Sequence, residues 1–378
     1  MQKLILFIGI FFCSIASPFF CVEAPRKLLP EEDPFRLWET AQAAFDAGRY
    51  DEAIIYAEQA RVNRIELYNW SVYTLQAALQ APSVKAAGDN LALILQLFRE
   101  RDVLDAENII VSLFEQKGEE YFNNSMMAVL SYLETTTVFP EVDMLIGRIY
   151  QVEGEYDLAE TYLTRAWENA AALDVPAMKN DILYLLANLA LVQGDVNAYE
   201  QALLLVLSDD PNFNGLLDDM LMEQTEKGLF VRSLTNALKR SMDIDKFFNL
   251  YRAESYQSLG ACIGLSELYL QNDETDKALA VSALGAVLAV TRVSSIVQQR
   301  DSEFAYSTVE DLLQTGIAYA DIRDWSIVTS LWKQLYLFAN ACRTAGYGDF
   351  SGELYRIIAN CAPENYWRQV ALQQILAQ

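Results

Sequence analysis

The sequence has 378 residues, 52% of them apolar and 12% aromatic, which is enough to bury a large core and excludes a disordered chain. Its 52 acidic and 28 basic residues give a net charge of −24, which opposes binding to nucleic-acid phosphates and to anionic lipid head groups. The absence of histidine removes the commonest general base and transition-metal ligand, so Ser-His-Asp and Cys-His catalytic systems are excluded.

Residues 1–24 have the pattern of an export signal. Lys3 and the amino group supply the positive region, and residues 4–12 (LILFIGIFF) supply the apolar core. Residues 14–16 (SIA) offer a cleavage site with small residues at both ends. A second small-x-small site at 22–24 is followed directly by Pro25, which should obstruct cleavage there. We therefore expect a removable signal peptide.

Two alternatives remain open at this end of the chain. Residues 4–22 carry no charge and are nearly long enough to span a bilayer, so they could act as an uncleaved membrane tether. Cys21 could be a lipoprotein site, although Phe19 and Phe20 stand where small residues are preferred. All three interpretations place the body of the protein outside the cytoplasm, in the periplasm or attached to the envelope.

The body of the chain is predicted to be all helical. Residues 25–33 form a polar, proline-bearing lead-in, and apolar residues recur with a helical period from Phe35 onward. Short breaks containing Gly or Asp interrupt this period. Because only 16 Gly and 9 Pro are present, long stretches have no helix breaker, which favours an all-α fold.

A hexapeptide of the form G-x-Y-D-x-A occurs twice, at residues 48–53 and 154–159. The glycine allows one helix to end in a tight turn, and the tyrosine fills the hairpin. The aspartate falls in the first turn of the following helix, where negative charge is favourable. The alanine lets the two helices approach closely. Each copy is therefore expected to be a helix-turn-helix hairpin.

The residues around these copies extend the pattern. The first copy has Ala41 before it and Ala57 and Ala60 after it. The second has Gly147, Tyr150, Leu163 and Ala166. A third reads Leu186, Ala187, Gly194, Asp195, Tyr199, Leu203, Val206 and Pro211. The arrangement resembles the tetratricopeptide repeat, whose signature is W-x2-L-G-x2-Y, then A-x3-F, then Pro.

This resemblance implies a right-handed α-solenoid of antiparallel helix pairs. Divergent copies place hairpin turns near residues 48, 101, 154, 194, 228, 273 and 323, and only the interval from 194 to 228 equals the family's period of 34. We therefore expect irregular repeat lengths. The repeats divide into an N-terminal set at 34–211 and a more divergent set at 212–378, which ends in capping helices at 348–350 and 367–376.

Nothing in the sequence indicates a chemical site. Phosphate-binding motifs are absent, and the acidic runs at 31–33, 209–210 and 218–219 are expected to be solvated turns or helix starts. Cys342 and Cys361 would lie roughly 13 Å apart along a helical hairpin, which is too far for a disulfide, so we predict buried thiols. The sequence therefore predicts no enzyme activity, no cofactor and no metal site.

The candidate binding site is the concave groove of the solenoid. In the repeat family the first helix of each pair lines this groove. The corresponding positions here are Phe35, Trp38, Gln42, Phe45, Met144, Arg148, Gln151, Tyr184, Asn188 and Leu191.

The aromatic residues of this set could equally belong to the packed core of the stack. Polar residues at such positions are less easily explained by packing, which draws attention to Arg148 and Asn188. Arg148 could pair with a carboxylate of a partner, or instead with a nearby acid of the same chain such as Asp143 or Glu155. The family's carboxylate clamp needs several basic and amide residues in the groove, and most matching positions here are apolar or acidic.

These features favour a non-catalytic, extracytoplasmic scaffold that holds a protein partner in an envelope assembly, such as a secretion, transport, outer-membrane or flagellar complex. The alternative is a peptide-binding or small-molecule-binding accessory of a transporter. That alternative predicts one deep cavity lined by aromatic side chains.

Overall fold

The computed structural model describes residues 25–80, 103–118, 137–208, 226–253 and 256–377. Within these ranges the chain forms α-helices and short 3-10 helices and no strand, which confirms the all-α prediction. The chain divides into two compact units, 1–149 and 150–378, which are described separately. The predicted turn near residue 101 and the predicted boundary at 211 lie outside the described residues.

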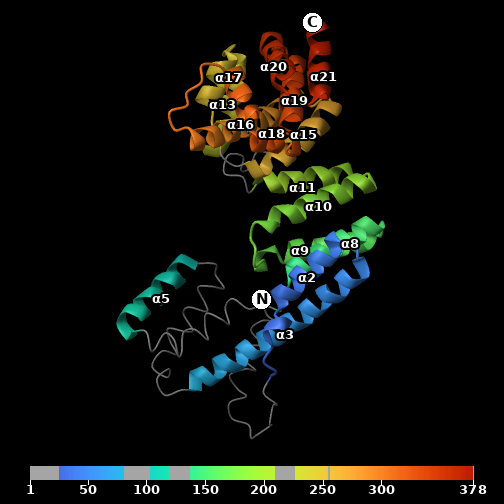
Figure 1. Cartoon of the computed structure of the whole chain (residues 1–378), viewed down its shortest axis with the longest axis vertical. Helices are drawn as coiled ribbons and strands as arrows, with labels where there is room; N and C mark the ends of the chain where they lie inside the picture. The colour runs from blue at the N-terminus through green and yellow to red at the C-terminus, as the bar shows by residue number, and fades with distance from the viewer. Residues whose placement is uncertain (1–24, 81–102, 119–136, 209–225, 254–255, 378) are drawn as a thin grey trace. The chain divides into compact units, whose positions relative to one another are not determined.

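The first unit is built on the antiparallel pair α2 (Pro34–Asp46) and α3 (Tyr50–Gln80) (Figure 1). Asp33 caps α2 by accepting hydrogen bonds from the backbone N–H groups of Phe35 and Arg36 at 3.0 and 3.1 Å. The two helices approach closely because their facing positions hold alanines. These are fully or almost fully buried: Ala41, Ala44, Ala53, Ala57 and Ala60. The unit also contains η2 (Pro30–Glu32), α5 (Val103–Lys117) and most of α8 (Pro140–Glu153).

Charged side chains connect α3 to the start of α8. Arg61 forms an ion pair with Asp143, whose side chain is only 7% exposed. The guanidinium of Arg64, itself buried, lies 5.1 Å from the ring centroid of Phe139. The side-chain amide of Asn63 donates to the carbonyl of Glu32 at 2.6 Å. These contacts fix the lead-in and α8 against one segment of α3.

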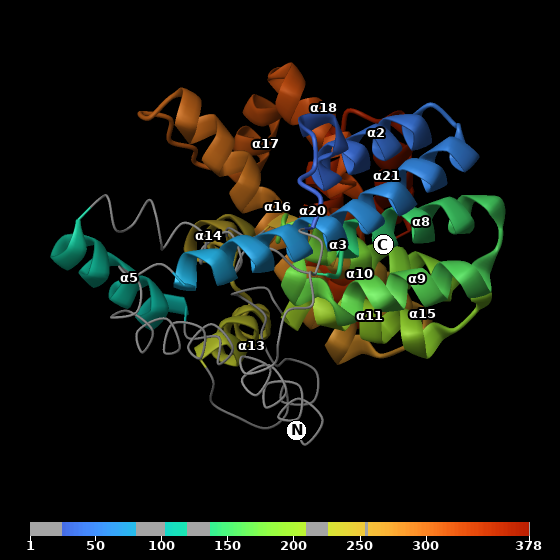
Figure 2. The ribbon, with the colours of Figure 1, turned by 90° about the horizontal axis from the view of Figure 1, so that it is seen from below.

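The second unit contains the remaining helices. They are α9 (Tyr156–Glu168), η5 (Ala170–Ala172), α10 (Met178–Gln193), α11 (Val196–Ser208), α13 (Glu226–Lys239), α14 (Ile244–Leu250), η6 (Tyr256–Ser258), α15 (Leu259–Gln271), α16 (Thr275–Arg300), α17 (Val309–Ala318), α18 (Ala320–Val328), α19 (Leu331–Thr344), α20 (Gly348–Cys361) and α21 (Asn365–Leu376). Consecutive helices pack as neighbours from α9 to α11 and from α15 to α21, as α10 and α11 do in Figures 1 and 2.

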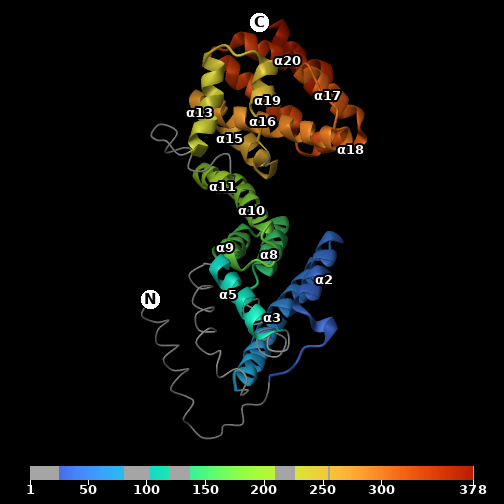
Figure 3. The same ribbon diagram turned by 90° about the vertical axis from the view of Figure 1, so that its left-hand side faces the viewer.

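The core of this unit surrounds α16, which contacts α13, α15, α17 and α19 (Figure 3). Among the described helices, α16 alone is long and apolar enough to cross a membrane, and 83% of its apolar window is buried inside the protein, as in a core helix. At Gly285 its backbone comes very close to both α15 and α19. A Cβ atom at this position would lie 2.7 Å from Cβ of Cys262 and 2.5 Å from the side-chain amide of Gln334. Glycine is thus required for three helices to meet.

Five helix pairs share one turn geometry. A residue with positive φ ends the first helix: Gly48 (73°), Gly154 (82°), Gly194 (78°), Asp273 (59°) and Gly346 (88°). In each case the next N–H donates to the carbonyl five residues earlier, at 2.8 to 2.9 Å, which is the Schellman arrangement. The second helix begins two residues after the positive-φ residue. The turns predicted at 48, 154, 194 and 273 are confirmed.

The buried positions repeat as well. Seven residues before each turn residue the chain carries a small, buried side chain or glycine: Ala41, Gly147, Ala187, Ser266 and Ala339. The residues 5, 9 and 12 positions after the turn residue are also buried, apart from the half-buried Tyr199. They are Ala53, Ala57 and Ala60; Ala159, Leu163 and Ala166; Tyr199, Leu203 and Val206; Ala278, Ser282 and Gly285; and Ser351, Tyr355 and Ile358. The four pairs that lie within one unit, α2–α3, α10–α11, α15–α16 and α19–α20, therefore pack in the same way.

Two predicted turns are wrong. Residue 228 lies within α13 and residue 323 within α18. Gly316, which the sequence pattern assigned to a repeat, instead allows α17 to approach α16, because a Cβ atom there would meet Cγ1 of Val293 at 2.7 Å. The final hairpin is α19–α20 with its turn at Gly346, so residues 348–350 of the predicted cap begin the second helix of this pair.

The three described cysteines are buried and form no disulfide, which confirms the prediction for Cys342 and Cys361. Burial raises the pKa of the Cys342 thiol well above its usual range. Burial, with a smaller contribution from the nearby Glu310 carboxylate, raises the pKa of Cys361 to about 12. Both thiols therefore stay protonated and behave as small apolar groups.

The turn geometry predicts opposite effects at two equivalent positions. Gly194→Ala should destabilise the second unit by about 1 kcal/mol, because a Cβ atom is unfavourable at positive φ. Asp273→Gly should stabilise it by up to about 0.5 kcal/mol, because Asp273 already occupies that conformation. Urea unfolding, followed by hydrogen exchange in α10 and α16, measures both. Changes of the same sign would contradict a shared turn.

Candidate functional site

The side of α2 that does not face α3 carries a row of large side chains at positions 35, 38, 42 and 45. Because the alanines of α2 face α3, these four side chains lie on another side of the helix and are each half-buried. The rings of Phe35 and Trp38 are 4.9 Å apart. Nε1 of Trp38 is buried and has no hydrogen-bond partner. Gln42 and Phe45, the later residues of the row, contact Arg148 of α8.

Gln42, Phe45 and Arg148 come together to form what we call the Arg148 cluster. The guanidinium of Arg148, on α8, lies over the ring of Phe45 with 4.7 Å between its central carbon and the ring centroid. Nη1 of Arg148 donates to Oε1 of Gln42 at 3.5 Å, a long hydrogen bond. Tyr50, the tyrosine of the first G-x-Y-D-x-A motif, packs on Phe45 at 5.7 Å between centroids. An aromatic surface therefore supports the cation.

Arg148 has no carboxylate partner among the described residues. The ion-pair alternative is wrong for Asp143, because that carboxylate pairs with Arg61. The contacts of Arg148 are with an aromatic ring and a neutral amide, and its side chain is half-exposed. A guanidinium in this setting retains donors for a planar acceptor, and a carboxylate matches its fork geometry.

Two other predicted groove residues serve packing. Met144 is only 3% exposed and belongs to the core. Tyr184 joins α10 to the start of α15, since its hydroxyl donates to the carbonyl of Gln257 at 2.8 Å and accepts from the N–H of Ala261 at 3.0 Å. Met144 is therefore a core residue, whereas the half-buried Tyr184 stays a predicted groove residue that also links two helices. The sequence pattern marks which helix face they occupy but not how closely the neighbouring element approaches.

The remaining predicted residues belong to the second unit. Gln151, near the end of α8, is half-buried, and Asn188 on α10 is exposed. Leu191 is 58% exposed. No hydrogen bond or ring contact joins any two of these three residues. They are surface positions that have not been drawn together into a cluster.

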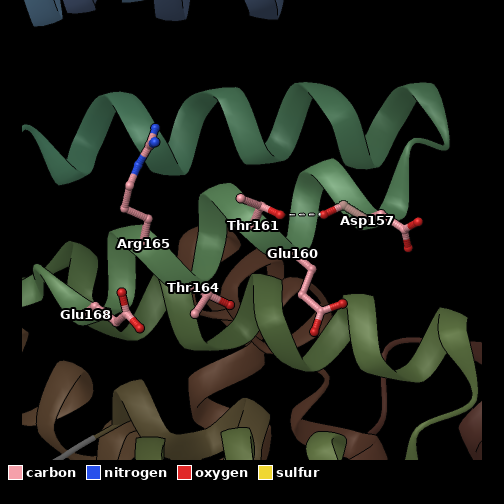
Figure 4. Close-up of a pocket in the computed structure, with 6 residues that line it drawn as sticks. All are labelled: Asp157, Glu160, Thr161, Thr164, Arg165 and Glu168. Atoms are coloured by element: carbon pink, nitrogen blue, oxygen red, sulfur yellow. Dashed lines mark hydrogen bonds between the residues drawn. The ribbon is translucent and has the colours of Figure 1, made fainter.

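A shallow depression of about 550 Å³ lies along α9 (Figure 4). Every residue that lines it comes from this one helix: Asp157, Glu160, Thr161, Thr164, Arg165 and Glu168. The hydroxyl of Thr161 donates back to the carbonyl of Asp157 at 2.9 Å. Substrate pockets normally collect groups from several elements, so this depression is best described as the polar outer face of a helix.

The acidic run at 31–33 performs structural tasks, as expected for a helix start. Glu32 accepts a hydrogen bond from the N–H of Leu29 at 2.9 Å, which is the main cause of a lowered pKa, with help from Arg26. Asp33 caps α2. The acidic runs at 209–210 and 218–219 lie outside the described residues. Within the described ranges, no three His, Cys, Asp or Glu side chains are placed to hold a metal ion.

No protein-family model matches the chain. It is similar to an uncharacterized protein of Treponema pallidum (strain Nichols), with 28% identity over 342 residues that cover 90% of this chain and 89% of the relative. An uncharacterized protein of Borreliella burgdorferi (strain ATCC 35210 / DSM 4680 / CIP 102532 / B31) shows 20% identity over 266 residues, covering 66% of this chain and 82% of that protein.

Proposed function

We propose that this chain is a tetratricopeptide-repeat-like scaffold that binds a protein partner through a carboxylate of that partner. The proposal is supported by five helix pairs that share one turn geometry, a small residue seven positions before the turn, and buried or half-buried residues 5, 9 and 12 positions after it. This spacing agrees with the repeat's small G position and with its A-x3-F pair. Right-handed stacking of the pairs is part of the proposal.

The Arg148 cluster is the observation that supports binding most directly. Its half-exposed guanidinium has no acidic partner in the described part of the chain, although the sequence has nearly twice as many acids as bases. The Phe45 ring holds the guanidinium in place, which reduces the conformational entropy lost when a carboxylate binds. The row of Phe35 and Trp38 beside it offers apolar surface for the residues next to that carboxylate.

The proposed location is outside the cytoplasm, in the periplasm or attached to the envelope, with residues 1–24 as the export signal. The observation behind it is a positive amino end, an apolar run at 4–12 and a small-x-small site at 14–16. Labelling of the native chain with a membrane-impermeant reagent tests it. Labelling only after cell lysis would contradict export.

Arg148→Met is expected to abolish partner capture while leaving the fold intact. A charge-assisted hydrogen bond contributes about 1.5 to 3 kcal/mol, so affinity should fall by about 10- to 100-fold. Stability should change by less than about 1 kcal/mol, because a cation–π contact at a half-exposed site contributes little. The measurement is photo-crosslinking from a reactive amino acid at position 42 in cells that express the chain naturally.

Arg165 provides a matched control, because its guanidinium also lies over an aromatic ring, that of Tyr162, at 4.6 Å. Arg165→Met should leave capture unchanged. Arg148→Lys, which keeps the charge but loses the planar fork, should retain part of it. The proposal is wrong if position 42 gives no reproducible protein adduct, or if Arg148→Met and Arg165→Met reduce adduct formation equally.

A peptide-binding or small-molecule-binding accessory remains the second proposal from the sequence. It requires an enclosed cavity lined by aromatic side chains, whereas the depression along α9 is shallow and polar. Binding of a small ligand would raise the melting temperature in proportion to the logarithm of its concentration. A thermal-shift screen that finds such a ligand for the wild-type chain but not for Arg148→Met would favour this second function.

A further inference from the structure

Helix α21 has one face that is packed and one that is not. The packed face lies against α19 and α20 (Figure 1). The ring centroid of Trp367 is 5.7 Å from that of Tyr336, and Ala371 is fully buried. Nε2 of Gln374 donates to the Tyr336 hydroxyl at 3.2 Å. These contacts fix the rotation of α21 about its axis and so determine which side chains point outward.

The outward face of α21 carries three exposed apolar side chains and no acidic one. Tyr366 is 64% exposed, Leu372 42% and Leu376 86%. Gln369 and Gln373 lie exposed between them. From residue 365 to residue 378 the only charged side chain is Arg368, although the whole chain carries 52 acids. Exposed large apolar side chains grouped on one helix face mark an interaction surface.

The charge distribution indicates what binds there. Two copies of a chain with a net charge of −24 repel each other over most of their surfaces. Contact through the outward face of α21 avoids this repulsion locally, because neither copy places a carboxylate on that helix. A neutral face can be complementary to itself, which a twofold dimer requires.

The order of residues along this face also suits a twofold axis. In an antiparallel pair centred near residue 371, Tyr366 of one copy lies opposite Leu376 of the other, and Gln369 lies opposite Gln373. Aromatic and aliphatic groups then meet at both ends, and the side-chain amides, which both donate and accept, meet between them. We propose that α21 pairs antiparallel with α21 of a second copy of this chain. This inference does not depend on the proposed function.

Sedimentation velocity of the full chain over a range of concentrations tests the pairing. A 12-residue helix is about 18 Å long, so the contact is small and the dimer should dissociate on dilution. Raising the salt from about 0.05 M to about 0.3 M should strengthen it, because screening weakens the repulsion between the acidic surfaces. Leu376→Asp should weaken association at least about tenfold.

Val328 is the matched control, since it is 83% exposed on α18 and Val328→Asp adds the same charge. This variant should associate like the wild type. A chain that is monomeric at every concentration, or that associates equally well as Leu376→Asp and as wild type, would overturn the proposal. If the chain is a monomer and the α21 amides lose exchange protection only in Leu376→Asp, another segment of the same chain covers this face. That result would also overturn the proposal.

Cysteine crosslinking tests the orientation. Gln369→Cys and Gln373→Cys chains, mixed under oxidising conditions, should form a mixed disulfide dimer above the wild-type background. Neither variant alone should form that dimer, because antiparallel pairing sets position 369 opposite position 373. Equal crosslinking within each single variant would indicate parallel pairing and contradict the proposed geometry.

Discussion

Gly285→Ala is expected to destabilise the second unit by about 2 to 3 kcal/mol. The added Cβ atom would lie 2.7 Å from Cβ of Cys262, which is fixed to the backbone of α15, and 2.5 Å from the amide of the fully buried Gln334. Overpacking of this kind forces backbone shifts that cost about 1 to 3 kcal/mol, and the clash on two sides places this case at the upper end. Urea unfolding with hydrogen exchange in α16 measures the loss.

The control for this prediction is Gly348→Ala in α20. A Cβ atom at Gly348 meets nothing within 4 Å, and the residue begins a helix. Alanine there should leave stability unchanged or increase it by up to about 1 kcal/mol, because the unfolded chain loses freedom. If Gly285→Ala were as harmless as Gly348→Ala, the close approach of α15, α16 and α19 would be wrong.

Arg61→Met is expected to destabilise the first unit by about 3 kcal/mol. It leaves the carboxylate of Asp143, 7% exposed, without its guanidinium partner, and removing one member of a buried pair costs about 3 to 5 kcal/mol. The lower end applies because the Arg61 side chain is 24% exposed and screened by solvent. Guanidinium chloride would screen the pair, so urea unfolding is the measurement.

Arg49→Met is the matched control, because Arg49 pairs with Glu52 at the surface, where both side chains are more than 40% exposed. Its effect should stay within about 0.5 kcal/mol. Adding Asp143→Asn to Arg61→Met should recover part of the lost stability, since the buried charge is removed. An additive loss in the double variant would show that the two side chains do not act on each other.

The position of Arg148 relative to α2 could be anticipated only in part. The spacing of Gln42, Phe45 and Arg148 from their turn glycines placed all three on the same face of successive first helices. Sequence could not decide between a partner's carboxylate and Asp143, because it does not reveal that Arg61, 82 residues earlier, reaches Asp143 first. Long-range pairing of this kind depends on how α3 meets α8.

The hairpins show the same division between local and tertiary information. The turns at Gly48, Gly154 and Gly194 could be predicted because each glycine stands at a fixed position in a repeated sequence pattern. Their positive φ angles agree with that prediction. The turn predicted at 323 is wrong because glycine has a second use: Gly316 admits a neighbouring helix. The turn predicted at 228 is wrong because that residue lies within α13. The outward face of α21 also had a signal, the lack of acids after residue 364, but only the packing of Trp367 and Ala371 shows which side is exposed.

The sequence by itself determined the helical class, several local turns and the burial of Cys342 and Cys361 without a disulfide, because periodicity, glycine conformation and hairpin spacing act over short distances. Only the tertiary structure decided that Met144 and Tyr184 take part in packing, that Arg148 lies on an aromatic ring with no carboxylate partner among the described residues, and that Gly285 lets α15, α16 and α19 meet. Those outcomes depend on how closely distant segments approach, which no local pattern specifies.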